Sequence, residues 1–222
     1  MADSNVQARF NMVEQQIRPW EIFDPKVLSL LEELPRERFV PPAYQHLAYA
    51  DIEIPLAHGQ CMMYPRMEAK ILQALELKPD DRVLEVGTGS GFLTACLARL
   101  AGQVVSIDLH EDFSEAASAR LQDLGIRNVS LRNGDALASP LEADGPFDAI
   151  AVTGSLPSSQ QADIFRQQLK PGGRLFVIVG TSPIMRALLI TRTPEGGFRE
   201  ENILETDLAP LENAELPPAF EF

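Results

Sequence analysis

A glycine-rich turn in the stretch LEVGTGSGFLTACLARL, residues 84–100, constrains this chain more than any other feature. It sets Gly87, Gly89 and Gly91 between an apolar run and a helical pattern. Glycine suits these positions because a side chain would block a ligand or the close packing of the following helix. An apolar strand, a glycine turn and a helix in this order begin a ligand-binding βαβ unit. We therefore expect an α/β fold with a ligand held at the turn.

Beyond residue 80, short apolar runs alternate with helical patterns, which predicts a doubly wound, mostly parallel sheet with helices on both faces. The segment 158–173 is expected to be a helix with a serine cap and a Pro-Gly-Gly stop. Runs on either side of the turn PEGG predict a C-terminal antiparallel hairpin. The predicted strands cover 82–86, 103–107, 128–132, 147–152 and 174–179; the other helices cover 91–102 and 110–125, and the hairpin covers 184–193 and 198–207.

The beginning of the chain has a different pattern, mostly helical with polar breaks. FDPKVLSLLEEL, residues 23–34, opens with an aspartate cap and a proline at the first helical position. RFVPPAYQHLAYADIEIP, residues 38–55, is too rich in proline and aromatic residues for a long helix. We interpret the whole chain as one domain. Its expected parts are a helical lid segment at 1–75, a cofactor-binding α/β core at 76–212 and a tail at 213–222.

Composition limits the partners and the compartment. The formal net charge of −13 would repel a phosphate backbone, which disfavours a nucleic-acid substrate. No stretch approaches the roughly 20 apolar residues that a bilayer span requires, so no membrane partner is expected. Two cysteines form no metal or disulfide framework, and the first residues do not resemble a secretory signal. We expect a cytoplasmic protein without a bound metal.

The spacing of the glycines distinguishes between two kinds of ligand. A dinucleotide fingerprint reads Gly-x-Gly-x-x-Gly, but here the third glycine comes one residue early and Phe92 takes its place. Asp108 ends the second predicted strand, 17 residues beyond Gly91, where an acid can accept both ribose hydroxyls. Asp135, in NGDA, ends the third strand and could accept from an adenine amino group. These positions predict an adenosine-containing ligand at the carboxyl ends of the strands.

The glycine spacing, with Glu85 two positions before the first glycine, resembles the motif of class I S-adenosylmethionine-dependent methyltransferases. That cofactor lacks phosphate and carries positive groups, so an acidic mouth containing Glu85 would suit it. The resemblance implies a Rossmann-like methyltransferase fold with S-adenosyl-L-methionine as cofactor. The residues expected at the cofactor are Glu85, Gly87, Thr88, Gly89, Gly91, Asp108, Leu109, Asp135, Ala136 and Thr153.

A longer set of motifs resembles the protein-L-isoaspartate O-methyltransferase family. Members methylate the side-chain carboxylate of isoaspartyl residues in damaged proteins, which starts repair. The resemblance therefore implies a protein or peptide partner carrying an isoaspartyl carboxylate. The motifs, in the family's order and at its usual spacing, are LPRERFVPPAY, DIEIPLAHGQ, RVLEVGTGSGFLTACLARL, NVSLRNGDA, PFDAIAVTGSLP and LKPGGRLFVIVG.

The loop that would hold the substrate departs from that pattern. Family members usually read Gly-Gln-Thr-Ile-Ser-x-Pro-His-Met, or Tyr for His, where this chain reads GQCMMYPRM at residues 59–67. Cys61 replaces the threonine, and Met63, which has no donor, replaces the serine. Arg66 replaces the aromatic residue and could bind a carboxylate bidentately. The loop methionines also suit plain packing. The residues expected at the substrate are Gln60, Cys61, Met63 and Arg66.

Methyl transfer to a carboxylate makes few chemical demands. The carboxylate is already ionised at neutral pH, so it needs no general base, and we assign no catalytic residue. His46, His58 and His110 are interpreted as surface or structural residues. Two alternatives remain because of Met63: a methyltransferase with another acceptor, and a cofactor-binding module without turnover. A nicotinamide-dependent oxidoreductase is disfavoured by Phe92 and by the lack of an evident proton donor.

Overall fold

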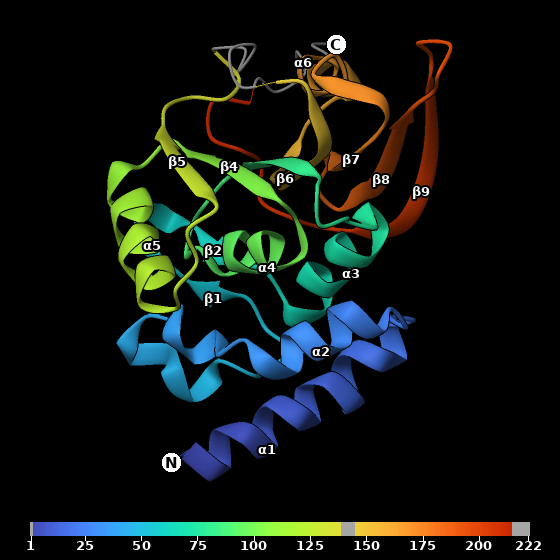
Figure 1. The fold of residues 1–222 in the computed structure, drawn as a ribbon. Helices are drawn as coiled ribbons and strands as arrows, with labels where there is room; N and C mark the ends of the chain where they lie inside the picture. The colour runs from blue at the N-terminus through green and yellow to red at the C-terminus, as the bar shows by residue number, and fades with distance from the viewer. Residues whose placement is uncertain (1, 139–144, 215–222) are drawn as a thin grey trace, which may run out of the picture.

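The computed structural model describes residues 2–138 and 145–214, and the centre of this part is a twisted seven-stranded sheet (Figure 1). The strand order is β5-β4-β3-β6-β7-β8-β9. The first five strands in that order are parallel, whereas β8 is antiparallel to β7 and β9 to β8. The predicted doubly wound fold with a C-terminal hairpin is confirmed. The strands are β3 (Arg82–Val86), β4 (Gln103–Asp108), β5 (Val129–Asn133), β6 (Phe147–Leu156), β7 (Leu169–Thr181), β8 (Ile184–Arg192) and β9 (Phe198–Thr206).

Alternate residues of the central strands pack on opposite faces of the sheet. Val83 and Val104 belong to one core cluster, while Leu84 and Val105 belong to the cluster on the other face. All four side chains are at most 1% exposed. Strands covered on both faces become nearly continuous apolar runs, which explains why β3 and β4 were recognisable in the sequence.

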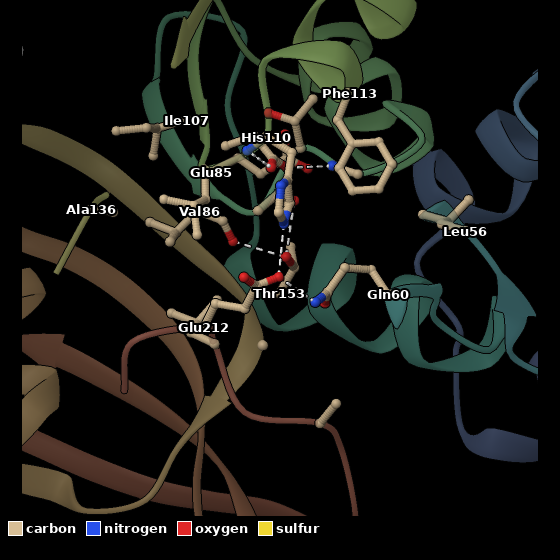
Figure 2. Close-up of a pocket in the computed structure, with 18 of the residues that line it drawn as sticks. Leu56, Gln60, Glu85, Val86, Ile107, His110, Phe113, Ala136, Thr153 and Glu212 are labelled. Carbon is tan, nitrogen blue, oxygen red and sulfur yellow. Dashed lines mark hydrogen bonds and ion pairs between the residues drawn. The ribbon is translucent and has the colours of Figure 1, made fainter. Parts of the chain in front are cut away.

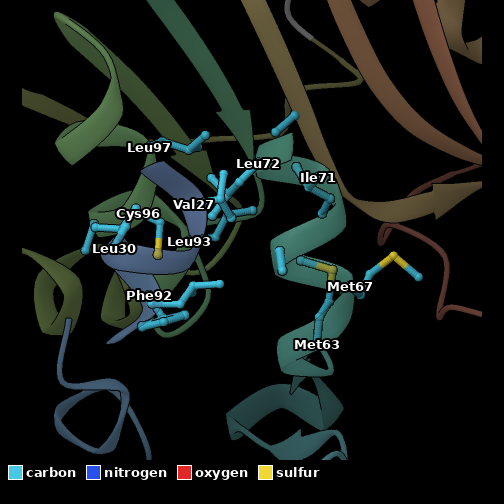
Figure 3. Packing of buried hydrophobic residues seen from close by; sticks show 14 of the residues in the cluster. Val27, Leu30, Met63, Met67, Ile71, Leu72, Phe92, Leu93, Cys96 and Leu97 are labelled. Carbon is cyan, nitrogen blue, oxygen red and sulfur yellow. The ribbon is translucent and has the colours of Figure 1, made fainter. Parts of the chain in front are cut away.

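Helices α3 (Pro65–Leu75), α4 (Phe92–Leu100) and α5 (Glu111–Asp123) contribute to the apolar cluster on one face of the central strands, and α4 and α5 follow β3 and β4 in the chain. Figure 3 shows α2 (Pro25–Glu33), α3 and α4 contributing to one apolar cluster, with Val27, Met67 and Cys96 among its labelled members. The N-terminal segment therefore shares its core with the helices that cover one face of the sheet.

The N-terminal segment is helical, as predicted, and is interrupted by short turns (Figure 1). Asp24 caps α2 by accepting from the backbone N–H of Lys26 at 2.8 Å. The function of residues 1–75 as a lid remains a prediction. The elements before α3 are α1 (Ala2–Met12), η1 (Val13–Ile17), η2 (Arg18–Trp20), α2 (Pro25–Glu33), η3 (Arg36–Arg38), η4 (Pro42–Leu47), β1 (Ile54–Pro55), η5 (Ala57–Gly59) and β2 (Cys61–Met62).

The helix predicted over 158–173 forms only in its first half, where Ser158 provides the predicted serine cap. Only η6 (Ser159–Ala162) and α6 (Asp163–Arg166) form there, and β7 begins at Leu169. The Pro-Gly-Gly segment belongs to β7, because its last glycine, Gly173, passes close to neighbouring backbone. A Cβ added at Gly173 would lie 3.0 Å from the carbonyl oxygen of Phe147 in the neighbouring strand β6. Glycine here permits a close strand contact instead of ending a helix.

Two further predictions concern the rest of the chain. Within the described ranges, no helix is long and apolar enough to cross a membrane. Most of the predicted tail at 213–222 lies outside the described residues.

Candidate active site

A cleft lies where parallel strands β3, β4 and β6 end, which is the point at which the strand order reverses direction. Open α/β sheets bind ligands at such switch points. The cleft has a volume of about 1000 Å³, including open solvent at its mouth. Figure 2 shows lining residues that come from the end of β3, from α5, from the loop before α3 and from the C-terminal segment.

The glycine turn brings backbone against the cleft because side chains are excluded from it. Gly87 has a φ of +95°, and a Cβ there would lie 2.1 Å from Thr153 Oγ1. That hydroxyl donates to the carbonyl oxygens of Val86, at 2.8 Å, and Gly87, at 2.9 Å. Gly91 has a φ of +83°, and a Cβ there would lie 2.8 Å from the Cβ of Ala117 in α5. The turn therefore requires glycine for both its conformation and its contacts.

Asp108 is the last residue of β4, and its carboxylate is only 7% exposed. The backbone N–H of Gly89 donates to Oδ2 at 2.8 Å, and that of His110 donates to Oδ1 at 2.9 Å. A carboxylate has about four acceptor sites, so each oxygen can accept a further bond. Asp108 also lines the cleft. It is therefore a fixed anionic acceptor next to the glycine turn.

Glu85 also lines the cleft but is 0% exposed, so the predicted place at an acidic mouth is wrong. Its Oε2 accepts from Thr94 Oγ1 and from Ser106 Oγ, the latter at 2.6 Å. Burial raises the pKa of Glu85 to about 8, although these two hydroxyls act to lower it. Among the described residues, Glu85 Oε1 has no hydrogen-bond partner. A buried acceptor of this kind is suited to a positively charged or hydrogen-bond-donating ligand.

The remaining predicted cofactor residues also reach the cleft. Asp135 accepts from the backbone N–H of Leu137 at 2.8 Å and from Asn213 Nδ2 at 2.9 Å. Ala136 is buried beside it, and Leu109 is 37% exposed. The whole predicted cofactor set except Gly91 lines this one cleft: Glu85, Gly87, Thr88, Gly89, Asp108, Leu109, Asp135, Ala136 and Thr153.

The loop before α3 contributes three of the four predicted substrate residues to the cleft: Gln60, Cys61 and Met63. Met63 is 6% exposed and packs in the apolar cluster of Figure 3. The Cys61 side chain is hydrogen-bonded to Glu53, and burial raises the pKa of the Cys61 thiol to about 11. At neutral pH the sulfur is therefore protonated and poorly nucleophilic.

Arg66 is not brought to the cleft. Its guanidinium forms an ion pair with Asp51 and lies 4.2 Å from the ring centroid of Trp20 and 4.7 Å from that of Tyr64. The partner carboxylate and the two rings hold Arg66 away from the lining residues. Its expected bidentate contact with a substrate carboxylate therefore has no support in this arrangement.

Sequence reasoning missed two residues at the cleft, His110 and Glu212. The His110 Nε2 lies 2.7 Å from Glu212 Oε1. The position of His110 two residues after Asp108 was a usable signal, because residues just after a parallel strand line the ligand crevice. Glu212 gave no signal, since 102 residues separate it from His110.

Comparisons with known proteins agree with the motifs. The profile of the protein-L-isoaspartate(D-aspartate) O-methyltransferase family matches residues 7–215. A protein-L-isoaspartate O-methyltransferase of Methylorubrum extorquens is 42% identical, with 92% of this chain and 88% of that protein aligned. One from Anaeromyxobacter dehalogenans is 43% identical, with 89% of this chain and 93% of that protein aligned.

A solved structure supports the fold. A Plasmodium falciparum protein described as a protein-L-isoaspartate O-methyltransferase, in complex with S-adenosyl-L-homocysteine, aligns with a TM-score of 0.78 at 22% identity. The alignment covers 92% of this chain and 98% of that one. The profile match and the relatives extend over nearly the whole chain, and this chain belongs to the protein-L-isoaspartate(D-aspartate) O-methyltransferase family.

Proposed function

We propose that this protein is an S-adenosyl-L-methionine-dependent protein-L-isoaspartate O-methyltransferase. The observation that carries the proposal is the convergence of Asp108, Glu85 and the glycine turn on one cleft in a chain of this family. The expected partner is a protein or peptide with an isoaspartyl carboxylate. Repair of damaged proteins and a cytoplasmic location are part of the same proposal.

The lining residues fit the cofactor. Gly87 and Gly89 leave room for its close approach, and Asp108 is suited to accept from two ribose hydroxyls. Glu85 lines the same cleft, where a positively charged ligand would favour its ionised form. Asp135 would accept from the adenine amino group. When bound, S-adenosyl-L-methionine supplies an electrophilic methyl group.

The acceptor needs alignment more than activation. An ionised carboxylate is nucleophilic enough to attack a sulfonium methyl group directly, so the cleft has to orient it and exclude water. The apolar side chains of Leu56, Met62 and Met63 line the cleft and are suited to excluding water.

The proposal predicts transfer of a labelled methyl group to an isoaspartyl peptide. The matched control is the same peptide with an ordinary aspartyl residue, whose carboxylate is displaced by one backbone atom. The product should be a base-labile ester. Tight cofactor binding with no transfer above blank would favour a cofactor-binding module instead. Transfer to other proteins without isoaspartyl preference would favour a different acceptor.

The raised pKa of Glu85 predicts how the free energy of unfolding depends on pH. Its pKa is 4.5 in its ordinary state and about 8 when folded, so the folded protein binds the proton more tightly. The free energy of unfolding should therefore fall as pH rises from about 4.5 to about 8. Glu85→Gln should flatten this fall in urea unfolding measured at pH 5 and pH 8.

The control for this prediction is Glu205→Gln, at an exposed acid on β9. A slope that remains in Glu85→Gln is expected from Glu68, because burial raises its pKa to about 7. A slope as steep as that of the wild-type protein would show that Glu85 is already ionised in the folded state at low pH.

A further inference from the structure

The loop at residues 59–67, which we call the acceptor loop, lacks the threonine and the serine that family members usually have there. Cys61 and Met63 stand in their places, and Arg66 is paired with Asp51 outside the cleft. A substrate carboxylate would therefore need donors from elsewhere in the lining.

The threonine hydroxyls of the cleft are already engaged, and Ser90, whose Oγ accepts from the Phe92 N–H at 3.3 Å, is only 7% exposed. Thr88 Oγ1 is 2.6 Å from Ser106 Oγ, and Thr153 Oγ1 donates to two backbone carbonyls. Within the described lining, Gln60 and His110 are the side chains that bring nitrogen donors. These two residues come from different elements, the loop before β2 and the start of α5.

Both donors meet on one carboxylate oxygen. Gln60 Nε2 donates to Glu212 Oε1 at 2.7 Å, and His110 Nε2 lies 2.7 Å from the same atom. Figure 2 shows these three side chains together inside the cleft. The pair of donors is therefore already arranged around a carboxylate, and that carboxylate belongs to the protein itself.

The His110 ring and the backbone of Gln60 are held by contacts of their own. The His110 ring stacks on that of His58, with centroids 3.9 Å apart, and meets the edge of Phe113 at 5.6 Å. The Gln60 carbonyl accepts from the Leu56 N–H at 2.8 Å, which ties the loop. The Glu212 side chain is 40% exposed.

The backbone before Glu212 is held by the sheet. The Ser155 N–H donates to the Ala209 carbonyl, and the Leu211 N–H donates to the Ser155 carbonyl, both at 2.9 Å. The segment can therefore stay in place while the Glu212 side chain alone rotates toward solvent.

We propose that Gln60 and His110 form the carboxylate-binding subsite for the methyl acceptor, and that Glu212 fills this subsite until a substrate displaces it. The inference rests on the proposed function and adds to it the donors that replace the missing hydroxyl groups. Glu212 acts as an internal competitor, because a subsite that is only partly free has a lower apparent affinity.

The test is direct binding of a fluorescent isoaspartyl peptide by anisotropy, with S-adenosyl-L-homocysteine present so that turnover does not interfere. A second peptide carries a carboxamide in place of the isoaspartyl carboxylate. We expect the wild-type protein to prefer the carboxylate by about tenfold. Glu212→Ala should tighten binding of the carboxylate peptide by roughly three- to tenfold. In Gln60→Ala combined with His110→Ala, the preference should disappear.

Two matched controls are available in the chain. Glu205→Ala removes another exposed acid, on β9, and His46→Ala removes an exposed histidine on η4. Both should keep the wild-type preference and affinity. Unchanged or weaker binding in Glu212→Ala, or a preference that survives loss of both donors, would overturn the proposal.

Methylation of the same peptide separates this inference from the proposed function. A wild-type protein that methylates the peptide, with no effect of Glu212→Ala on binding, would keep the function and remove the subsite. A protein that prefers the carboxylate in binding but transfers no methyl group would keep the subsite and remove the function.

Discussion

Asp108→Asn is expected to weaken binding of S-adenosyl-L-homocysteine by about a hundredfold. The carboxylate now accepts from the N–H groups of Gly89 and His110, and its other lone pairs face the cleft. Asparagine has the same shape as aspartate, but its amide NH2 replaces one carboxylate oxygen. That NH2 group cannot accept a hydrogen bond from a backbone N–H or from a ribose hydroxyl. A hundredfold loss corresponds to about 2.7 kcal/mol, which is the contribution expected from one to two hydrogen bonds to a charged group.

The measurement is the dissociation constant by isothermal titration calorimetry. Asp112→Asn is the matched control, because Asp112 lies four residues further along, is exposed and pairs with His58 outside the lining residues. It should bind as tightly as the wild-type protein. An affinity of Asp108→Asn within threefold of the wild-type value would mean that the ribose hydroxyls are bound elsewhere.

The sequence predicted the parts of the fold that depend on local pattern. Strand β3 and helix α4 were found because an apolar run, three glycines and a helical pattern follow one another within residues 82–100. The helix predicted over 158–173 was too long because a Pro-Gly-Gly sequence can either end a helix or allow a close contact between strands. The contact of Gly173 with Phe147 shows that the second case applies here. Tertiary contact overrides a local signal there.

The residues of the candidate site likewise divide into those that a local pattern predicts and those that depend on contacts between distant segments. Asp108 and Asp135 were predictable because they end strands that the pattern located. The pairing of Arg66 with Asp51 was not predictable, since 15 residues separate them and no local pattern placed Trp20 against the guanidinium. The burial of Glu85 depends on Thr94 and Ser106, which lie on two different elements. Contacts between different helices and strands set the charge state and the orientation of a side chain, and the hydrophobic periodicity of the sequence does not show such contacts.

Arg36 is the buried residue whose loss should cost the most stability. It is 0% exposed, forms an ion pair with Glu68, and donates to the carbonyls of Ala48, at 3.0 Å, and Met63, at 2.8 Å. Its guanidinium also lies 4.7 Å from the ring centroid of Phe92. One side chain therefore joins the N-terminal segment, the acceptor loop, α3 and α4.

Arg36→Met should lower the free energy of unfolding by about 3–5 kcal/mol, because it leaves Glu68 as a buried charge without its partner. Arg36→Met combined with Glu68→Met should lose less than the sum of the single losses, by a coupling of about 2–3 kcal/mol, since the double variant buries no unpaired charge. Urea unfolding of the wild-type protein, the two single variants and the double variant measures this coupling in a double-mutant cycle.

Arg18→Met is the control, because Arg18 pairs with Glu14 on the surface and should change stability by about 0.5 kcal/mol or less. A loss below about 1 kcal/mol in Arg36→Met, or strict additivity in the double variant, would mean that Arg36 and Glu68 do not depend on each other. With the coupling as expected, the residual loss in the double variant belongs to the Ala48 and Met63 carbonyls, which would tie the position of the acceptor loop to a residue that does not itself line the cleft.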